Sequence, residues 1–188
     1  MAYLISCWAS SILAKRFVLI IVSAVLCSCS WPRYPSAWPP LVETRDRCPK
    51  LSRVYDNLDE ERRLSLTSIF NLPFPGTELL SSPVMISGVE DGVLEVTLWS
   101  DGRLVAKNRL VADKKDFSCE DGWIELGTTG FTGPQLAGPY GKYTRLSTQL
   151  DGSLVAKKGF WAVGLAYLVA PLGTSEYTWH RFKTRDIK

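Results

Sequence analysis

Few residues of this chain are of the types that carry out catalysis. His180 is the only histidine, so a hydrolase built on a Ser–His or Cys–His pair would need it as the base. It lies in the segment YTWHRF, where strand alternation puts Thr178 and Phe182 on its face. A histidine in such a plain strand is ordinarily structural. We therefore expect no catalytic residue and no enzymatic activity.

Motifs for cofactors and metals are also missing from the sequence. It contains no GxSxG, HExxH, Rossmann glycine pattern or phosphate-binding GxxxxGK[ST] loop, so we expect no cofactor. It has no CxxC pair either, and His180 cannot complete a zinc ligand set, so we expect no metal site. We interpret Asp59, Glu60 and Glu61 as solvated charges at a helix start. A carboxylate pair of the glycosidase type stays open as an alternative.

Composition and charge narrow the possible functions. The chain has 188 residues, of which 46% are hydrophobic and 22% charged, and this excludes disordered, collagen-like and coiled-coil proteins. The formal net charge is +3, but Lys15 and Arg16 lie in a segment, 1–28, that contains no acid. Residues 29–188 therefore have a formal net charge close to zero. Nucleic acid is therefore not an expected partner, because its binding draws on a dense cationic face.

The N-terminal segment has the pattern of a secretory signal. Lys15 and Arg16 precede an apolar run from Phe17 to Leu26, which is short for a membrane-spanning helix of about 20 residues and typical of a signal peptide. We predict a signal peptide over residues 1–28. A buried helix, or a membrane anchor that includes Tyr3 to Ala14, is the alternative.

The residues Leu26, Cys27, Ser28 and Cys29 follow this apolar run directly. A leucine, two small residues and a cysteine in this order resemble the lipobox of bacterial lipoprotein precursors. The resemblance implies that Cys29 is lipidated and that this lipid attaches the chain to a membrane. Because residue 30 is Ser and not Asp, it also implies the inner face of the outer membrane. Several acyl chains hold a protein stably at a bilayer without a transmembrane helix.

Two cysteines remain for the folded domain once Cys7 and Cys27 are assigned to the signal peptide and Cys29 to the lipid. In the oxidising periplasm, Cys48 and Cys119 are predicted to form a disulfide. Two free buried thiols are the alternative.

A proline-rich stretch separates the predicted anchor from the folded domain. The segment 29–47 contains four prolines and no apolar periodicity, which predicts a semi-rigid spacer. A proline-rich ligand for a partner's aromatic groove is the alternative. We place the globular domain at 48–188.

The domain opens on the segment CPKLS at 48–52. Together with Gly-Trp-Ile at 122–124 and Trp-His-Arg-Phe at 179–182, this opening resembles a group of Gram-negative envelope lipoproteins in which a CPxLS segment follows the spacer. The resemblance implies a place in the cell envelope and no particular activity.

The first part of the domain predicts one α-helix. Asn57 can cap it, and Glu60 follows three residues later, as in a capping box. Asn71, Pro73 and Pro75 would end it. The positions that share one side of the predicted helix are Leu58, Arg62, Leu66, Ile69 and Phe70.

From residue 84 onward the hydrophobic pattern alternates. Asp-Gly occurs at 91, 101, 121 and 151, and this dipeptide favours two-residue hairpin turns. The segments DGRLVAK at 101 and DGSLVAK at 151 are near-copies. We therefore expect a mainly β, α+β fold, an antiparallel meander or partial barrel of about seven to nine strands with one N-terminal α-helix.

Three later segments have a pattern of their own. The apolar run from Phe160 to Ala170 predicts a central strand, and Glu176 to Lys183 predicts the last strand. The segment 127–141 contains five glycines and two prolines, which predicts a long loop. That loop is either a flexible connection or a binding loop.

The aromatic residues Trp99, Trp123, Trp161 and Trp179 all fall in predicted strands. On an exposed strand face they would form a stacking platform for a glycan or a hot spot for a protein. The alternative is that most of them belong to the core.

We therefore expect a non-catalytic binding or assembly module of the cell envelope, whose partner is another envelope protein or a glycan. One alternative is a carrier of a small ligand or lipid with a cupped sheet, which would show a deep apolar pocket. Another is an inhibitor of lysozyme-type enzymes. A binding module would instead show a filled core and exposed aromatic residues.

Overall fold

The computed structural model describes residues 33–42, 48–73, 76–131, 136–166 and 170–186. The chain divides into two compact units, Met1–Arg33 and Tyr34–Lys188. Of the first unit, Arg33 alone is described, so the predicted signal peptide and Cys29 lie outside the described residues. Within the described residues, no helix has the length and apolar character needed to cross a membrane.

The first sheet contains four antiparallel strands in the order β1-β2-β3-β4. Its strands are β1 (Arg53–Tyr55), β2 (Val84–Glu90), β3 (Val93–Ser100) and β4 (Arg103–Val111). The predicted alternation is confirmed in β3, where Leu94, Val96 and Leu98 are buried and Glu95 and Thr97 are half-buried. One face of this sheet is therefore in the core.

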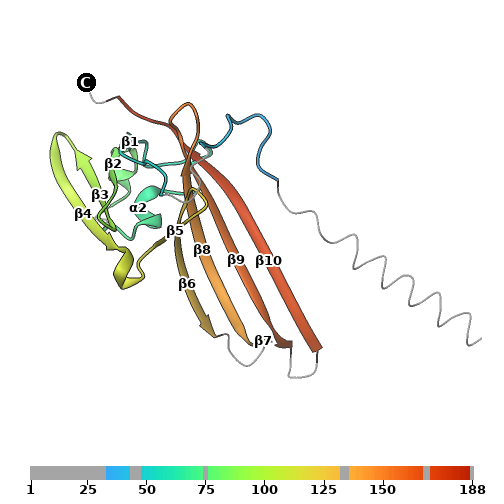
Figure 1. Ribbon diagram of the computed structural model, residues 1–188. Coiled ribbons are helices and arrows are strands. Elements are labelled where there is room, and N and C mark those ends of the chain that lie inside the picture. The colour runs from blue at the N-terminus through green and yellow to red at the C-terminus, as the bar shows by residue number, and fades with distance from the viewer. Residues whose placement is uncertain (1–32, 43–47, 74–75, 132–135, 167–169, 187–188) are drawn as a thin grey trace, which may run out of the picture. The chain divides into compact units, whose positions relative to one another are not determined.

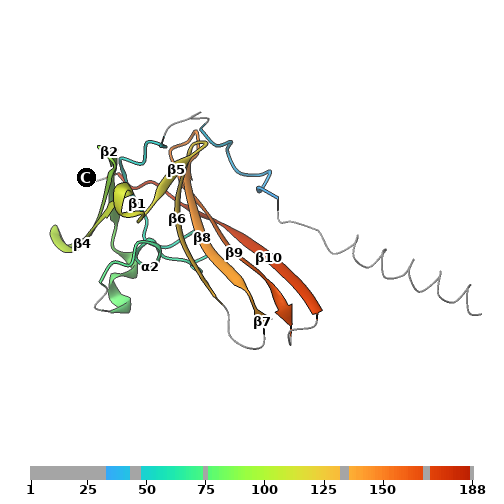
Figure 2. The same cartoon turned by 60° about the horizontal axis from the view of Figure 1, so that its bottom comes forward.

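The second sheet is larger and has the antiparallel order β10-β9-β8-β6-β5, with β7 paired to β9. Its strands are β5 (Ser118–Glu120), β6 (Trp123–Phe131), β7 (Leu136–Ala137), β8 (Pro139–Thr148), β9 (Leu154–Ala166) and β10 (Ala170–Phe182). In Figures 1 and 2, β6, β8, β9 and β10 run side by side and extend well beyond the first sheet.

One hydrophobic core joins the two sheets. Ile86 and Leu98 from the first sheet, Ile124 and Leu146 from the second, and Phe70 between them belong to a single buried cluster. Burial of each such side chain contributes about 1.5–3 kcal/mol. The predicted mainly β, antiparallel fold is thus confirmed, and among the described strands the sheets do not close into a barrel.

The helix is much shorter than predicted. It covers Leu66–Ile69 (α2) and is capped by Ser65, and Figures 1 and 2 show it between the two sheets. The predicted cap, Asn57, is buried and accepts a hydrogen bond from the backbone N–H of Thr67 at 3.0 Å. Arg62 has φ 57°, which a continuous right-handed helix does not allow. The predicted helix start at Asn57 is wrong, because the Asn57 side chain binds the backbone of Thr67, ten residues later in the sequence.

Two short 3₁₀ helices complete the helical structure of the described residues. They are Thr77–Ser81, before β2, and Ala112–Lys114, after β4.

Three of the four Asp-Gly dipeptides form the predicted two-residue turns. Asp91, Asp101 and Asp121 have φ of 48°, 50° and 49°, and the glycine after each is also in the left-handed region, as this turn type requires. The prediction is wrong for the fourth dipeptide. It lies in the longer connection from β8 to β9, where Gly152 has φ 86° and Asp151 accepts a hydrogen bond from the N–H of Ser153 at 2.9 Å.

The near-copies DGRLVAK and DGSLVAK stand in different environments. In the first copy, Leu104 and Val105 lie on the edge strand β4 and are 50% and 37% exposed. In the second, Leu154 and Val155 lie in β9, between two other strands, and both are fully buried.

The glycine-rich segment predicted as a long loop, 127–141, is largely strand. β6 runs to Phe131 and β8 begins at Pro139, with 132–135 outside the described residues. The glycines lie opposite aromatic residues in the register, in the pairs Gly130–Tyr140, Gly141–Trp161 and Gly159–Tyr143. A Cβ atom at any of the three would come within 3.0 Å of the paired ring. Each ring therefore covers its glycine, and this packing stabilises strands that glycine alone would weaken.

The strand predicted from the apolar run 160–170 is central, as expected, but its bounds differ from the prediction. β9 lies between β8 and β10, as expected for the apolar run 160–170. The run is divided between the end of β9 and the start of β10, which begins at Ala170 and not at Glu176. Both strands cross the same apolar end of the sheet, so their hydrophobic patterns merge in the sequence.

The predicted disulfide between Cys48 and Cys119 is present. It closes a sequence separation of 71 residues, with 5.1 Å between the two Cα atoms. Cys119 lies in β5 and packs against the core. The bond therefore fixes the beginning of the domain to the edge of the second sheet.

Candidate functional site

Three of the four candidate tryptophans lie on one face of the second sheet. The register aligns Trp179 with Lys157 and Lys157 with Arg145, and four residues further along it aligns Trp161 with Gly141. Because side chains alternate along a strand, these residues point away from the core face that carries Ile124 and Leu146. We call this side the aromatic face. Its aromatic members are Tyr34, Trp123, Tyr143, Trp161, Tyr177 and Trp179, all half-buried.

Trp179 is at the centre of a cluster of rings on this face. Its ring centroid is 5.2 Å from that of Tyr34, 6.1 Å from that of Tyr177 and 6.2 Å from that of Trp123. The contacts with Tyr34 and Tyr177 are edge to face, an arrangement that the ring quadrupoles favour. The ammonium of Lys157 lies 4.0 Å from the centroid of Tyr177 and binds its π face.

Lys157 is held in a partly dry environment. Burial lowers the pKa of its ammonium, and the neighbouring Arg145 lowers it further. Arg145 in turn donates from Nε to Glu125 Oε2 and lies 5.7 Å from the centroid of Tyr143. Charged and aromatic side chains therefore alternate across the strands of this face.

Tyr143 and Trp161 differ from the Trp179 cluster because glycine lies beneath their rings. Tyr143 covers Gly159, and Trp161 covers Gly141. Each of these rings lies close to the backbone of the neighbouring strand and is half-buried. We call this part of the aromatic face the platform.

Trp99 is not part of this face. It lies in β3 of the first sheet, is 38% exposed, and donates from Nε1 to Thr97 Oγ1 at 3.0 Å. The sequence grouped four tryptophans, and the fold brings together Trp123, Trp161 and Trp179.

Part of the predicted spacer lies against the sheet and extends the aromatic face. The N–H of Val42 donates to the carbonyl of Thr148 at 2.8 Å, and the N–H of Leu150 donates to the carbonyl of Pro40 at 3.1 Å. Tyr34 contacts the ring of Trp179 edge to face, and burial raises the pKa of the Tyr34 hydroxyl. The proline-rich stretch is therefore attached to the domain over residues 34–42.

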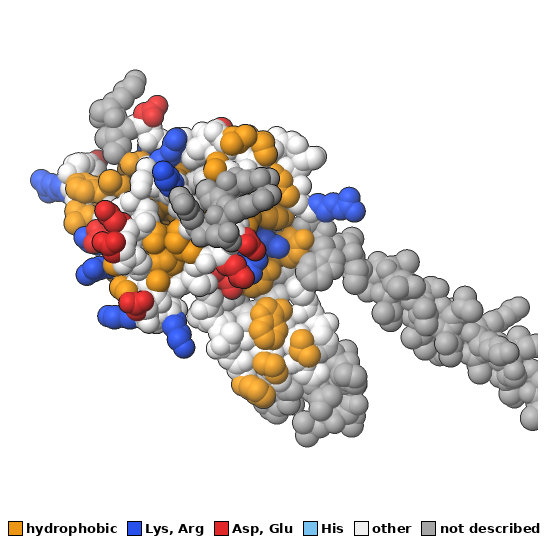
Figure 3. Space-filling model, in the orientation of Figure 1, with side chains coloured by type: hydrophobic (Ala, Val, Ile, Leu, Met, Phe, Trp, Pro, Cys, Tyr) orange, Lys and Arg blue, Asp and Glu red, His pale blue; other side chains and the backbone are white. Residues whose placement is uncertain are grey.

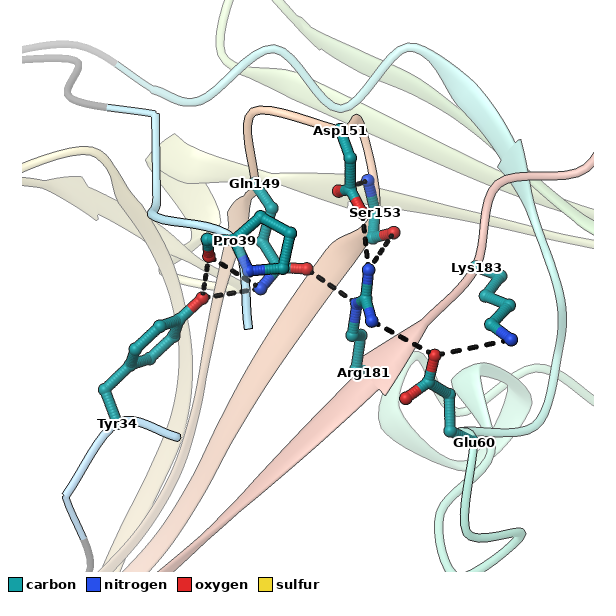
Figure 4. Close-up of polar contacts among 8 residues, drawn as sticks. All are labelled: Tyr34, Pro39, Glu60, Gln149, Asp151, Ser153, Arg181 and Lys183. Carbon is teal, nitrogen blue, oxygen red and sulfur yellow. Dashed lines mark hydrogen bonds and ion pairs between the residues drawn. The ribbon is translucent and has the colours of Figure 1, made fainter. Parts of the chain in front are cut away.

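Gln149 and Arg181 hold this attachment, as Figure 4 shows. The buried amide of Gln149 donates to Tyr34 Oη and, at 3.0 Å, to the carbonyl of Pro39. Its Oε1 accepts from Arg181 Nε at 2.8 Å. Arg181 also pairs with Asp151 and, at 3.3 Å, with Glu60. Burial raises the pKa of Asp151, but the hydrogen bonds from Ser153 and Arg181 outweigh it, so the net pKa is lowered.

On the opposite side of the sheet, His180 is buried and paired with Asp59. His180 Nδ1 is 2.8 Å from Asp59 Oδ2, and His180 Nε2 is 2.8 Å from Thr178 Oγ1. Burial raises the pKa of Asp59, but the hydrogen bond from His180 and those from the N–H groups of Leu64 and Arg63 outweigh it, so the net pKa is lowered. The interpretation of Asp59 as a solvated surface charge is therefore wrong.

A groove of about 750 Å³ runs beside this pair on the inner side of the second sheet. Its walls include the hydroxyl groups of Thr128, Thr144 and Thr178 and the ammonium groups of Lys142 and Lys158. Apolar side chains line it as well, namely Leu64, Ile69, Phe70, Leu110, Leu126 and Phe160. The groove is therefore mixed in character and is not a purely apolar pocket.

Thr178, His180 and Asp59 have the hydrogen-bond order of a hydrolase triad, hydroxyl to imidazole to carboxylate. Asp59 also has a structural task, because its Oδ1 accepts from the backbone N–H groups of Arg63 and Leu64 at 2.6 and 2.9 Å. In the part of the chain that the structure describes, no three His, Cys, Asp and Glu side chains are grouped so that they could hold a metal ion.

Comparison with known proteins finds no matching family model, no matching curated protein and no matching solved structure.

Sequence reasoning missed the residues that complete the aromatic face. Tyr177 is two positions from Trp179, so alternation alone could have placed it on the same face. Tyr143 and Lys157 depend on the strand register, and Tyr34 depends on the folding back of the proline-rich stretch. Neither of these can be obtained from local spacing.

Proposed function

We propose that this chain is a non-catalytic binding protein of the bacterial cell envelope, anchored through a lipid on Cys29 to the inner face of the outer membrane. In this proposal the aromatic face binds a glycan. The observation that supports it best is the platform, where Tyr143 and Trp161 each lie over a glycine and are half-buried.

The platform suits a glycan ligand better than it suits a protein partner. The C–H groups of a sugar ring pack against the negative face of an aromatic ring, and a flat ring offers that face without an induced rearrangement. The hydroxyls of the sugar need polar partners at the edge of the platform. Thr129 and Ser175 are exposed and lie in the same row as Trp161, and the Arg145–Glu125 pair lies beside Tyr143.

The alternative of a lipid or small-ligand carrier has less support. The core between the sheets is filled by one continuous cluster of buried side chains. The groove on the inner side of the second sheet has lysine and threonine side chains among its apolar ones, and these polar groups are poor partners for an acyl chain. A filled core with half-exposed aromatic residues is what a binding module requires.

Binding to purified peptidoglycan sacculi tests the proposal. Trp161→Ala and Tyr143→Ala should each weaken co-sedimentation at least about tenfold, as loss of a central aromatic contact does. Trp99→Ala is the matched control, because it removes a tryptophan from a strand outside the aromatic face. Thermal unfolding of each variant separates lost binding from lost structure.

Two results would overturn the glycan proposal. One is wild-type protein that stays in the supernatant with sacculi. The other is equal binding by folded Trp161→Ala, Tyr143→Ala and Trp99→Ala variants. Capture of an envelope protein through the same face would favour the protein-binding alternative, which includes an inhibitor of lysozyme-type enzymes.

A further inference from the structure

The end of the second sheet that lies near β7 carries no charged side chain. The sequence has no Asp, Glu, Lys, Arg or His at 126–141 or at 159–175. We call the described strand residues of these two stretches the distal end. Its segments are 126–131, 136–137, 139–141, 159–166 and 170–175. On the side that Figure 3 shows, the described side chains of the projecting end are hydrophobic or uncharged.

Large apolar side chains are exposed at the distal end. Phe131 in β6 is 76% exposed, and Val163 in β9 is 56% exposed. Both occupy the odd-numbered positions that point to the aromatic face, because Phe131 follows Thr129, and Val163 follows Trp161, by two residues. Exposed apolar surface of this kind marks a contact site for a protein or a membrane.

A collar of mostly basic residues borders the distal end. The nearest charged residue is Glu125 on β6, Lys142 on β8, Lys158 on β9 and Glu176 on β10, and the next ones on β9 and β8 are Lys157 and Arg145. Arg145 is paired with Glu125, so the remaining charges are three lysines and Glu176. Tyr140 and Phe160 lie in the part of the distal end that is next to the lysines.

We propose that the distal end binds the surface of a phospholipid bilayer that contains anionic lipids. An apolar tip, an aromatic belt and a lysine collar follow one another in the order that a membrane interface requires, from acyl chains to headgroups to water. The lysines meet the negative headgroups, and Phe131 and Val163 enter the boundary with the acyl chains. This inference goes beyond the proposed function and rests on neither the lipid at Cys29 nor the glycan.

The depth of this contact is limited by the strand edges. β10 is an edge strand, and within the described strands Gly127–Phe131 of β6 pairs with β8 alone. Unpaired N–H and C=O groups cannot lie in the hydrocarbon region. The sheet end therefore rests in the headgroup zone and does not span the bilayer.

A fluorophore that reports on its surroundings, attached at the distal end, tests the proposal. In the full chain, Cys7, Cys27 and Cys29 are changed to alanine, the Cys48–Cys119 bond is kept, and an environment-sensitive dye is attached at Val163→Cys. Leu150→Cys is the matched control, because Leu150 is also apolar and exposed, at 69%, and lies in the β8–β9 connection. The vesicles contain phosphatidylglycerol and phosphatidylcholine.

With these vesicles, the emission of the dye at position 163 should move to shorter wavelength and be quenched by brominated lipid, while the dye at position 150 stays unchanged. The N-terminal segment is the same in both proteins, so it cannot produce this difference. Lys142→Gln and Lys158→Gln should each weaken the response to anionic vesicles about fivefold, because a lysine near the surface adds roughly 1 kcal/mol.

Three results would overturn the membrane proposal. They are equal spectra for the two dye positions with vesicles, an equal response to pure phosphatidylcholine and to anionic vesicles, and a concentration-dependent shift at position 163 without vesicles. The last would indicate that a second copy of the chain covers the distal end. Sacculi carry no phospholipid and vesicles carry no glycan, so failure here and failure of the glycan proposal are distinguishable.

Discussion

Asp59 Oδ2 and His180 Nδ1 lie 2.8 Å apart, although 121 positions separate the two residues in the sequence. Both side chains are almost completely buried. The other carboxylate oxygen of Asp59 binds the backbone N–H groups of Arg63 and Leu64. One carboxylate thus closes the turn before α2 and attaches it to β10.

Asp59→Asn should destabilise the fold. The Asp59 carboxylate accepts hydrogen bonds from Arg63, Leu64 and His180, and a hydrogen bond to a charged group contributes about 1.5–3 kcal/mol. We expect a loss of about that size, measured by urea denaturation at pH 7. Glu61→Gln is the control, since Glu61 is exposed and its loss should leave the free energy of unfolding nearly unchanged. Equal unfolding curves for wild type and Asp59→Asn would contradict the role assigned to Asp59.

The same variant has a defined pH dependence. The pKa of Asp59 is lower in the fold than its ordinary value of 3.8, so the ionised form favours folding. Its contribution is complete above pH 4–5, about one unit above the pKa in the unfolded chain, and is lost as the pH falls through the lowered pKa. The stability difference between wild type and Asp59→Asn should therefore shrink as the pH falls below about 4. A stability difference between the two proteins that grows as the pH falls would contradict this prediction.

Thr178→Val separates a structural His180 from a catalytic one. The substitution removes the hydroxyl that lies 2.8 Å from His180 Nε2 and leaves the buried Asp59–His180 pair intact. We expect unchanged abundance, unchanged sacculus binding and a change in unfolding free energy within about 1 kcal/mol. If a stable, abundant Thr178→Val protein failed to restore the wild-type phenotype to cells that lack this chain, a catalytic role for His180 would be favoured. His180→Ala is a poor test, because it leaves Asp59 buried without its partner.

Loss of the Cys48–Cys119 bond should lower stability by about 4 kcal/mol. The chain-entropy model gives this value for a loop closed over 71 residues, and strain or residual unfolded structure reduces it. Unfolding of the Cys48→Ala/Cys119→Ala double variant measures the effect. Thiol titration of denatured, unreduced wild-type protein checks the bond itself, and two reactive thiols in the mature domain would refute it.

The lipid at Cys29 is checked by metabolic labelling. Labelled palmitate should enter the wild-type protein and not Cys29→Ala, because the lipobox-like order places the acylated thiol at this position. Cys27→Ala should still be labelled, since the leucine before Cys27 does not suit the cleavage position. Equal labelling of wild type and Cys29→Ala would remove the anchor from the proposal.

Local sequence patterns predicted the features that depend on near neighbours. Alternation identified β3, Asp-Gly located three tight turns, and a count of the cysteines left Cys48 and Cys119 as a pair. Each of these conclusions needs a window of a few residues or the redox chemistry of a compartment. Contacts with residues distant in the sequence do not change these features.

The failures have a common physical cause, which is a partner distant in the sequence. Asn57 looked like a helix cap, but its amide binds the backbone of Thr67. Gly130 and Gly141 looked like loop residues until the register placed Tyr140 and Trp161 over them. Asp59 looked solvated until β10 supplied His180. For the candidate site, the period of two identified Trp179, whereas Tyr34 and Tyr143 required the complete sheet.

The two LVAK segments will respond differently to random mutation. Polar and charged replacements of Leu104 and Val105 change an exposed edge and should survive selection, whereas the same replacements of Leu154 and Val155 create buried polar groups and should be purged. We therefore expect the two segments to become less similar mainly through changes in the first one. In related chains the second copy should remain recognisable long after the first has drifted, and a search for the repeat would lose it at residues 104 and 105 first.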